Sequence, residues 1–264
     1  MKLRRMIVIG SIILFAQQAG AQTPLRVFCS NGMKAVLEDI RARAEQAIGR
    51  PLGNIEFNTS AAIRQKIQAG EAFDVAILSS EVLEDLIKGG KIAAASRTDL
   101  GRSGIGVGIR SGAPKPDIKT PEALKKTLLA AKSMTWVEVG ASRVHIEKLL
   151  KDLGITQEVK PKTILTPGVD ESVASVAAGK TELLITLVSE IVPAKGLDFV
   201  GPLPAKVQGY VSLAGGVSAS SKNADAGKVL IKLLTAPSAV ATYQAKGMEL
   251  VIQSDTPPNR IPAK

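Results

Sequence analysis

The stretch VFCSNGMKAV, Val27–Val36, passes from a strand pattern to a helix pattern within a single short turn. Its apolar beginning is typical of a buried strand. Ser30, Asn31 and Gly32 come next, and apolar residues then recur at helical spacing as far as Ala44. A strand followed directly by a helix is the first half of a βαβ unit. This stretch therefore predicts an α/β fold with small polar residues where the helix begins.

The same alternation continues along the chain. Helical patterns separate strand-like segments at 25–29, 54–58, 73–78, 103–110, 133–139, 163–167 and 182–189. An extended stretch at 209–219 and two helical segments, 225–236 and 237–247, follow them. Strands separated by short helices predict right-handed βαβ units and a parallel sheet.

Two similar α/β sets divide the chain. We expect residues 23–104 and 208–264 to form lobe 1, and residues 105–207 to form lobe 2. Two crossings between the lobes would leave a cleft, and small ligands bind at such interfaces and at the C-terminal ends of parallel strands. The predicted fold class is α/β, with two lobes and a ligand cleft between them.

The first residues have the order of a secretory signal peptide. MKLRRM is basic, IVIGSIILFA is apolar, and AGA offers small residues for cleavage after Ala21. The apolar part is too short to span a bilayer comfortably; an uncleaved amphipathic anchor is the alternative. We therefore expect residues 1–22 to be removed, and the mature protein to be periplasmic and not embedded in the membrane.

The charge and composition favour a small anionic ligand. The net charge is +10, and Lys2, Arg4 and Arg5 in the predicted signal peptide leave about +7 for the mature chain. Aromatic residues make up only 3%, and no run of Lys or Arg exceeds two residues. That composition argues against nucleic-acid binding. A mild positive field attracts small anions instead.

Cys29 is the only cysteine and His145 the only histidine. An intrachain disulfide and a Cys-based zinc site are therefore excluded, and we expect neither a metal nor another cofactor. A Ser-His-Asp hydrolase would have to use His145, and the sequence contains no G-x-S-x-G motif.

Small polar residues lie at four predicted strand-to-helix junctions. These junctions are Ser30, Asn31 and Gly32; Thr59 and Ser60; Gly140, Ala141, Ser142 and Arg143; and Ser189 and Glu190. Three of the four are rich in hydroxyls and free of acids. Helix N-termini present free N–H groups that attract negative charge; ordinary helix capping is the alternative for each junction alone. The predicted ligand-binding residues are Ser30, Asn31, Thr59, Ser60, Ala141, Ser142 and Arg143.

Two residues near the third junction could contribute charge chemistry. Arg143 lies in the first helical turn, where a cation is unfavourable because it opposes the helix dipole. Pairing with a bound carboxylate would explain a cation at this position; a solvated surface Arg is the alternative. His145 lies in the same turn, where positive potential favours a neutral base. His145 is therefore a candidate for ligand contact or catalysis; a half-buried packing role is the alternative.

The segments VFCSNGMKAVLEDI, FNTSAAIRQKIQAGEAFDVAIL, GASRVHIEKLL and GPLPAKVQGY resemble the periplasmic molybdate-binding-protein-like family. The resemblance covers nearly the whole mature chain and implies a type II periplasmic-binding-protein fold. It also implies ligand contacts from Ser30, from Ser60 and from the backbone of 140–142. Members that bind molybdate usually place a Tyr in the strand before the last junction, and here the matching position is near Leu187.

A subgroup with CSNGMKAV openings is similar to periplasmic aconitate isomerases. That resemblance implies conversion of trans-aconitate to cis-aconitate by an allylic 1,3-proton shift, with no cofactor. Such a reaction needs a group to carry the proton, and we take His145 as the catalytic candidate, with Cys29 and Glu190 behind it. The alternative is the substrate-binding subunit of an ABC importer for a molybdate-like oxyanion or a small organic acid, which would have a membrane permease as its partner.

Overall fold

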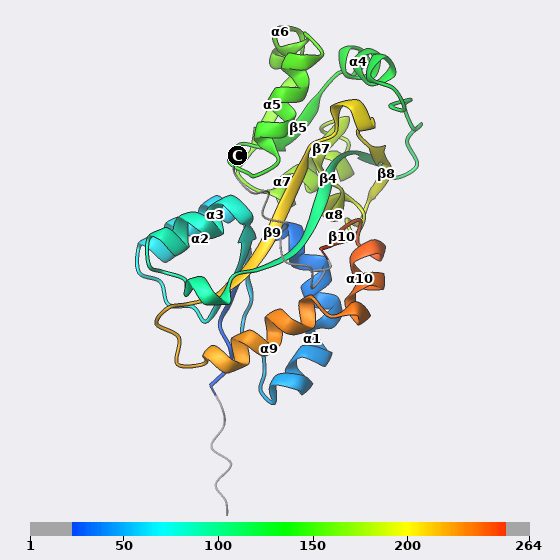
Figure 1. Cartoon of the computed structure of the whole chain (residues 1–264). Coiled ribbons are helices and arrows are strands. Elements are labelled where there is room, and N and C mark those ends of the chain that lie inside the picture. The colour runs from blue at the N-terminus through cyan, green and yellow to red at the C-terminus, as the bar shows by residue number, and fades with distance from the viewer. Residues whose placement is uncertain (1–22, 252–264) are drawn as a thin grey trace, which may run out of the picture.

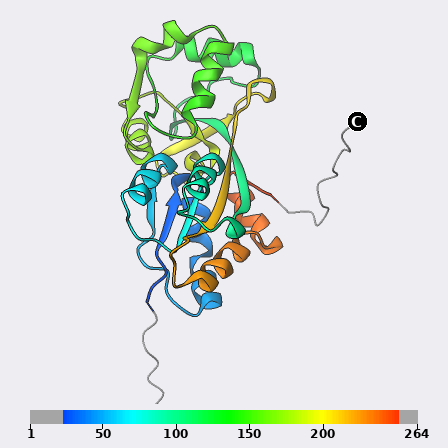
Figure 2. The ribbon, with the colours of Figure 1, turned by 60° about the vertical axis from the view of Figure 1, so that its left-hand side comes forward.

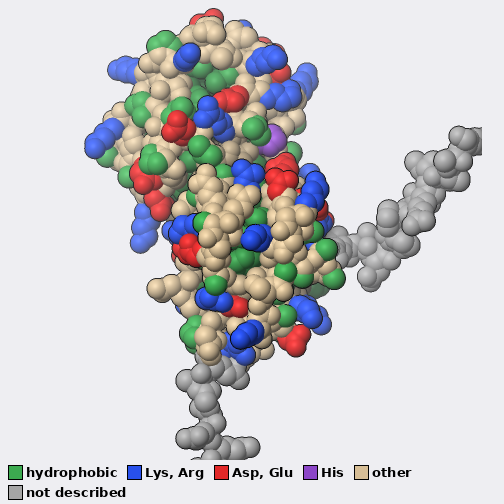
Figure 3. All heavy atoms as spheres, turned by 90° about the vertical axis from the view of Figure 1, so that its left-hand side faces the viewer, with side chains coloured by type: hydrophobic (Ala, Val, Ile, Leu, Met, Phe, Trp, Pro, Cys, Tyr) green, Lys and Arg blue, Asp and Glu red, His purple; other side chains and the backbone are tan. Residues whose placement is uncertain are grey.

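The computed structural model describes residues 23–251 (Figure 1). The predicted signal peptide, residues 1–22, lies outside the described residues, as does the chain after residue 251. The molecule has two halves joined by long strands, and a waist between the halves is visible from two further directions (Figures 2 and 3). None of the helices within 23–251 is long and apolar enough to span a membrane.

Strands and helices alternate through most of the chain, as the sequence predicts. The elements of the first half are β1 Val27–Ser30, α1 Lys34–Ile48, β2 Glu56–Asn58, α2 Ser60–Gln68, β3 Val75–Ser79, α3 Ser80–Lys88 and β4 Thr98–Arg110. The next elements are α4 Pro121–Ala130, β5 Met134–Val137, α5 Arg143–Asp152, α6 Thr156–Val159, β6 Thr163–Thr166, α7 Val169–Ala177, β7 Leu183–Leu187, α8 Val188–Ile191 and β8 Leu197–Pro202. The last elements are β9 Tyr210–Val217, α9 Ala224–Leu234, α10 Val240–Ala245 and β10 Glu249–Leu250.

Local signals set several of these boundaries. Thr120 caps α4 by accepting a hydrogen bond from the Ala123 N–H (3.1 Å), and Pro121 occupies the first helical position. Thr59 caps α2 through the Ala62 N–H in the same way. Gly154 follows α5 with a φ of +63°, a left-handed conformation that favours glycine.

The sheet is mixed rather than purely parallel. Its strand order is β2-β1-β3-β9-β4-β7-β5-β6, with β8 and β10 also pairing with β4. β1 runs parallel to β2 and β3, and β5 runs parallel to β6 and β7. The long strands β4 and β9 run antiparallel to their neighbours. The prediction of a parallel sheet is therefore right within each half and wrong for the strands that join them.

The strand β4 connects the two halves. Its residues 98–104 pair with β9, and its residues 105–109 pair with β7. This change of partner falls at the predicted boundary between residues 104 and 105. The division of the chain into two lobes stays a prediction.

Helices cover both faces of the sheet in the first half (Figure 1). Alternate residues of β1 and β3 pack against α1 and α9 on one face and against α2 and α3 on the other. Phe28 and Phe73 stack on the second face, with ring centroids 5.6 Å apart. The larger apolar cluster continues along β4 into the second half, so one core supports both sides of the waist.

Candidate functional site

A narrow cleft lies between the two halves, lined by residues at the ends of strands from each half. It is lined by Ser30, Asn31, Thr59, Ser60, Val137, Gly140, Ala141, Ser142, Val169, Leu187, Glu190 and Val211. Six of the eight predicted site residues are in this set. Its volume is about 20 Å³, which is room for a water molecule and not for a larger organic ligand. The cleft is therefore closed in this structure.

The first half contributes hydroxyl donors to the cleft. The Ser60 Oγ accepts a hydrogen bond from the Ser79 N–H at 2.9 Å, so its own proton remains free to donate. The Thr59 Oγ1 likewise accepts from the Ala62 N–H at 3.2 Å. Ser30 and Ser60 are almost completely buried, with exposed fractions of 7% and 3%. Buried hydroxyls whose protons are free suit an anionic ligand.

Free backbone donors accompany these hydroxyls. Thr59 satisfies only the third N–H of α2, and within residues 23–251 the N–H groups of Ser60 and Ala61 have no acceptor. At the start of α5, the Ala141 and Ser142 N–H groups also lack a partner among the described residues. Two helix N-termini from opposite halves thus direct unpaired amides to the same region.

The remaining wall of the cleft is apolar. Val137, Val169, Leu187 and Val211 line it, and each is less than a tenth exposed. Gly32 lets the first junction approach this wall, because a Cβ at that position would lie 2.9 Å from Leu187 Cδ1. The site therefore combines polar donors at several points with an apolar wall. That combination suits a ligand with anionic groups on a hydrocarbon skeleton.

Glu190 is the only ionisable side chain among the residues that line the cleft. Thr186 Oγ1 donates a 2.5 Å hydrogen bond to Glu190 Oε2. The side chain keeps some exposed surface, yet the atoms packed around its carboxyl exclude most water. This desolvation raises the pKa of Glu190 to about 7, and the nearby Asp170 carboxylate adds to the rise. The hydrogen bonds from Thr186 and the Leu187 backbone act in the opposite direction.

The structure does not place Arg143 in this cleft. Its Nε pairs with Glu147 Oε1 at 2.6 Å, and its Nη1 donates to the Glu138 carbonyl oxygen. Arg143 instead lines a separate hollow with Trp136. Both partners are on its own segment, so the guanidinium has polar partners at the start of α5 without a bound ligand.

His145 and Cys29 also lie outside the lining of the cleft. His145 packs against the backbone of the second crossing, where a Cβ at Gly209 would lie 2.7 Å from the imidazole Cγ and Nδ1. Cys29 is fully buried, its Sγ donates to the Ser30 carbonyl oxygen at 3.4 Å, and burial raises the pKa of its thiol. In this closed arrangement neither side chain faces the space that the junctions enclose.

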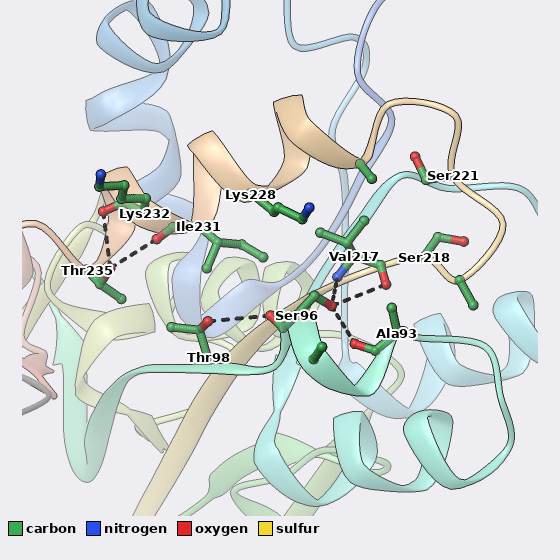
Figure 4. Close-up of a pocket in the computed structure, with 13 residues that line it drawn as sticks. Ala93, Ser96, Thr98, Val217, Ser218, Ser221, Lys228, Ile231, Lys232 and Thr235 are labelled. Carbon is green, nitrogen blue, oxygen red and sulfur yellow. Dashed lines mark hydrogen bonds between the residues drawn. The ribbon is translucent and has the colours of Figure 1, made fainter. Parts of the chain in front are cut away.

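A larger hollow of about 540 Å³ lies in the first half, beside α9 (Figure 4). Its hydroxyls are engaged within the protein. Ser96 Oγ donates to the Ala93 carbonyl oxygen at 2.6 Å and accepts from the Val217 N–H at 2.8 Å. Thr235 Oγ1 donates to carbonyl oxygens of its own helix (Figure 4). The Ser96 hydrogen bonds hold its loop against β9. The size of the hollow alone does not make it a binding site.

Two features of the cleft do not follow from the sequence: the burial of the Glu190 carboxyl and the apolar wall. Burial of a carboxyl is a tertiary property. A signal was present, however: Thr186 and Glu190 are four residues apart, and they span the end of a predicted buried strand. The wall residues are spread over four separate segments, so no local pattern identifies them.

The chain belongs to the bacterial extracellular solute-binding protein family, whose pattern matches residues 25–249. The predicted resemblance and the predicted fold class are both confirmed. The chain is similar in fold to the periplasmic molybdate-binding protein of Azotobacter vinelandii, with a TM-score of 0.72 and 17% identity over 85% of this chain and 98% of that one. It is also similar to the sulfate-binding protein of Mycobacterium tuberculosis H37Rv, with a TM-score of 0.67 and 18% identity over 87% of each chain.

A sequence relative gives a more specific comparison. The chain is 28% identical over 253 residues to an aconitate isomerase from a Pseudomonas species. The match covers 93% of this chain and 96% of that enzyme.

Proposed function

We propose that this protein is a periplasmic isomerase that interconverts trans-aconitate and cis-aconitate without a cofactor. The observation that carries the proposal is the similarity to an aconitate isomerase, which extends over almost the full length of both chains. The geometry of the cleft supports it separately. Hydroxyl and amide donors suit carboxylates, and the apolar wall suits the unsaturated carbon skeleton that joins them.

The reaction is an allylic 1,3-proton shift. Removing a proton beside the double bond of aconitate spreads negative charge over the conjugated carboxylate. Donors that are already fixed in place stabilise such charge without reorganisation, and in a closed cleft water does not screen them. The hydroxyls of Ser30, Thr59 and Ser60 and the amides of Ala141 and Ser142 are proposed to serve this purpose.

The alternative is the substrate-binding subunit of an ABC importer, with a membrane permease as its partner. The family and the fold similarity to a molybdate-binding protein favour this second reading. The apolar wall around Leu187 argues against a tetrahedral oxyanion as the ligand, because the family resemblance leads us to expect a Tyr at that position. An apolar side chain there offers no donor to a fourth oxygen.

The test is a turnover assay on the mature chain, residues 23–264. The protein is incubated with trans-aconitate in the presence of EDTA, and formation of cis-aconitate is followed by proton NMR and ultraviolet absorbance. We expect catalytic turnover. Stoichiometric binding of trans-aconitate without product would overturn the isomerase.

A thermal-shift panel with molybdate, tungstate, sulfate and citrate tests the importer reading in parallel. We expect stabilisation by citrate and little by the tetrahedral oxyanions. A large shift with molybdate, together with no turnover of trans-aconitate, would favour the binding subunit instead.

A further inference from the structure

The cleft contains one group that can exchange a proton near neutral pH. Its lining consists of Ser, Thr, Asn, Gly, Ala, Val and Leu residues apart from Glu190. Hydroxyl and amide groups donate hydrogen bonds but do not carry a proton between two carbon atoms. A proton shift inside this closed space therefore requires Glu190 or a group that the lining does not include.

Glu190 is held firmly at the edge of the space. It lies on α8, and the Ser189 N–H at the start of that helix donates to Ser103 Oγ of β4 at 3.1 Å. Thr186, which is fully buried in β7, fixes one carboxylate oxygen, Oε2. The carboxyl also accepts a hydrogen bond from the Leu187 backbone. These two hydrogen bonds restrain the carboxyl, and Glu190 still lines the cleft.

Glu190 also lines a second, wider groove of about 430 Å³ that adjoins the cleft. The charged groups of this groove are Lys34 and Glu38 of α1, Asp170 of α7, and Lys195 after α8. Asn31 and Val169 line both spaces, so the carboxyl stands between the enclosed cleft and an opening with its own cations and acids. The groove offers a route by which the carboxyl equilibrates its proton with solvent.

We propose that Glu190 is the catalytic residue that takes the proton from one carbon of aconitate and returns it to another, an inference that rests on the proposed isomerase function. Its carboxylate removes a proton from the CH₂ carbon. The electron pair of that C–H bond forms a double bond to the central carbon, and the pair of the original double bond moves onto the far carbon and its carboxylate. Protonated Glu190 then delivers the proton to the far carbon. One C–H bond breaks and one forms, with no net oxidation.

The acidity of Glu190 suits this double role. A pKa near 7 leaves comparable amounts of base and acid at neutral pH, which is the condition under which one group both accepts and donates efficiently. His145 and Cys29 do not compete in this structure, because neither lines the cleft and the Cys29 thiol is held in its protonated form by burial.

The experiment compares Glu190→Gln with Glu182→Gln and with the unchanged protein. Glu182 belongs to the segment that enters β7, accepts a hydrogen bond from the Lys132 N–H, and is exposed outside the cleft. Two properties are measured: kcat for trans-aconitate, and the Kd of propane-1,2,3-tricarboxylate, a saturated analogue that cannot undergo the shift. Circular dichroism checks that each variant is folded.

We expect Glu190→Gln to lower kcat by about 10²- to 10⁴-fold, the usual contribution of a general acid–base group. Its Kd for the analogue should change by less than about threefold, and Glu182→Gln should match the unchanged protein. If Glu190→Gln keeps more than a tenth of kcat, the inference is overturned while the isomerase function stands. An unchanged protein without turnover overturns both.

A second pair of variants covers the case in which Glu190→Gln does not fold. Glu190→Asp keeps the carboxyl but shortens its reach, and we expect measurable activity below a tenth of the original. His145→Ala is the competing substitution. Loss of turnover in His145→Ala with Glu190→Asp fully active would assign the proton to the imidazole and overturn the inference.

Discussion

At the scale of single residues, Glu190 and Thr186 act as one unit. Desolvation favours the neutral carboxylic acid, whereas the Thr186 hydrogen bond favours the charged carboxylate. The balance between them sets the pH at which the side chain becomes a base. Four of the other residues that line the cleft carry hydroxyls, which do not titrate in this range, and the rest are uncharged, so pH should act on the site through Glu190.

We predict that kcat/KM rises with pH through about 7 and then levels off, because the base form of Glu190 starts the reaction. Thr186→Val removes the donor that favours the carboxylate, so the midpoint of its kcat/KM profile should lie at higher pH. Thr186→Ser keeps the hydroxyl, so its kcat/KM profile should have the midpoint of the unchanged protein. The measurement is kcat/KM from pH 5 to pH 9 for the three proteins. Identical profiles for all of them would show that Thr186 does not tune this carboxyl.

The Glu190 carboxyl should also make the free energy of unfolding depend on pH. The pKa of Glu190 is raised in the folded state, from an ordinary value of 4.5 to about 7. The folded protein therefore binds the proton more tightly than the unfolded chain does. The contribution to stability is complete below pH 4.5 and is lost as the pH rises through 7. Above that pH the buried carboxylate is a net cost of at most roughly 3 kcal/mol.

Glu190→Gln cannot ionise, so it should gain stability relative to the unchanged protein as the pH rises. We predict that the difference in unfolding free energy between the two proteins shifts in favour of Gln by about 1–3 kcal/mol from pH 5 to pH 8. Urea unfolding at both pH values measures it. Glu182→Gln serves as the control and should show no such trend. A constant difference would mean that the carboxyl is well solvated.

At the scale of elements, the junctions between strands and helices were the most predictable part of the molecule. The carboxyl ends of parallel strands meet at one edge of a sheet, so Ser30 and Ser60 could be placed together from order alone. The joining strands were not predictable in the same way. The beginning of β4, from Thr98 to Ser103, mixes polar residues with glycine because it is only partly buried. Gly101 is needed there, since a Cβ would lie 2.6 Å from the Glu249 carbonyl oxygen.

The strand β8 was missed for a related reason. Its burial pattern has a single buried residue, Leu197, and its alternation is interrupted by Gly201 and Pro202. The strand therefore lacks the alternation of apolar and polar residues by which a half-buried strand is recognised. Arg143 illustrates a different limit. Its position at a helix start drew attention to a bound carboxylate, but the Glu147 side chain one turn later supplies the negative charge.

The junction at α2 makes a direct prediction about ligand binding. Ser60→Ala removes a hydroxyl donor to a bound carboxylate, and a hydrogen bond to a charged group contributes about 1.5–3 kcal/mol. The Kd of propane-1,2,3-tricarboxylate should therefore rise by roughly 10- to 100-fold. The variant also leaves the Ser79 N–H without its acceptor, so its unfolding free energy should fall by about 1–3 kcal/mol.

Ser80→Ala is the matched control for Ser60→Ala. Ser80 is likewise the first residue of a helix that follows directly after a strand, but it does not line the cleft. Its Oγ is buried and has no partner within the described residues. Removing it should leave the Kd unchanged. Equal effects of the two substitutions on Kd would show that the change acts through general stability.

At the scale of the whole molecule, the closed cleft requires a movement. A space of about 20 Å³ cannot admit aconitate, so the two halves must separate before substrate enters and product leaves. The connections that can flex are the two crossings, where β4 changes partner and where the chain enters β9. Their geometry should therefore influence both binding and turnover.

Gln208 fastens these crossings to each other. Its Oε1 accepts from the Ile105 and Gly209 N–H groups, both at 3.0 Å, and its Nε2 donates to the Ile105 carbonyl oxygen at 3.1 Å. One side chain thus joins both connections at the point where the halves meet. His145 packs on the same segment, at Gly209.

We predict that Gln208→Ala weakens this joint and favours the open arrangement. KM should rise and kcat should fall together by several-fold, because the population of the closed form contributes to both. Small-angle scattering measures the arrangement directly: the unliganded variant should have a larger radius of gyration than the unchanged protein, and saturating propane-1,2,3-tricarboxylate should reduce it. Gln157→Ala, an exposed substitution on α6, is the control for general effects. If Gln208→Ala changes neither the kinetic constants nor the radius of gyration, the two halves are not hinged at this side chain, and the opening must originate elsewhere along β4 and β9.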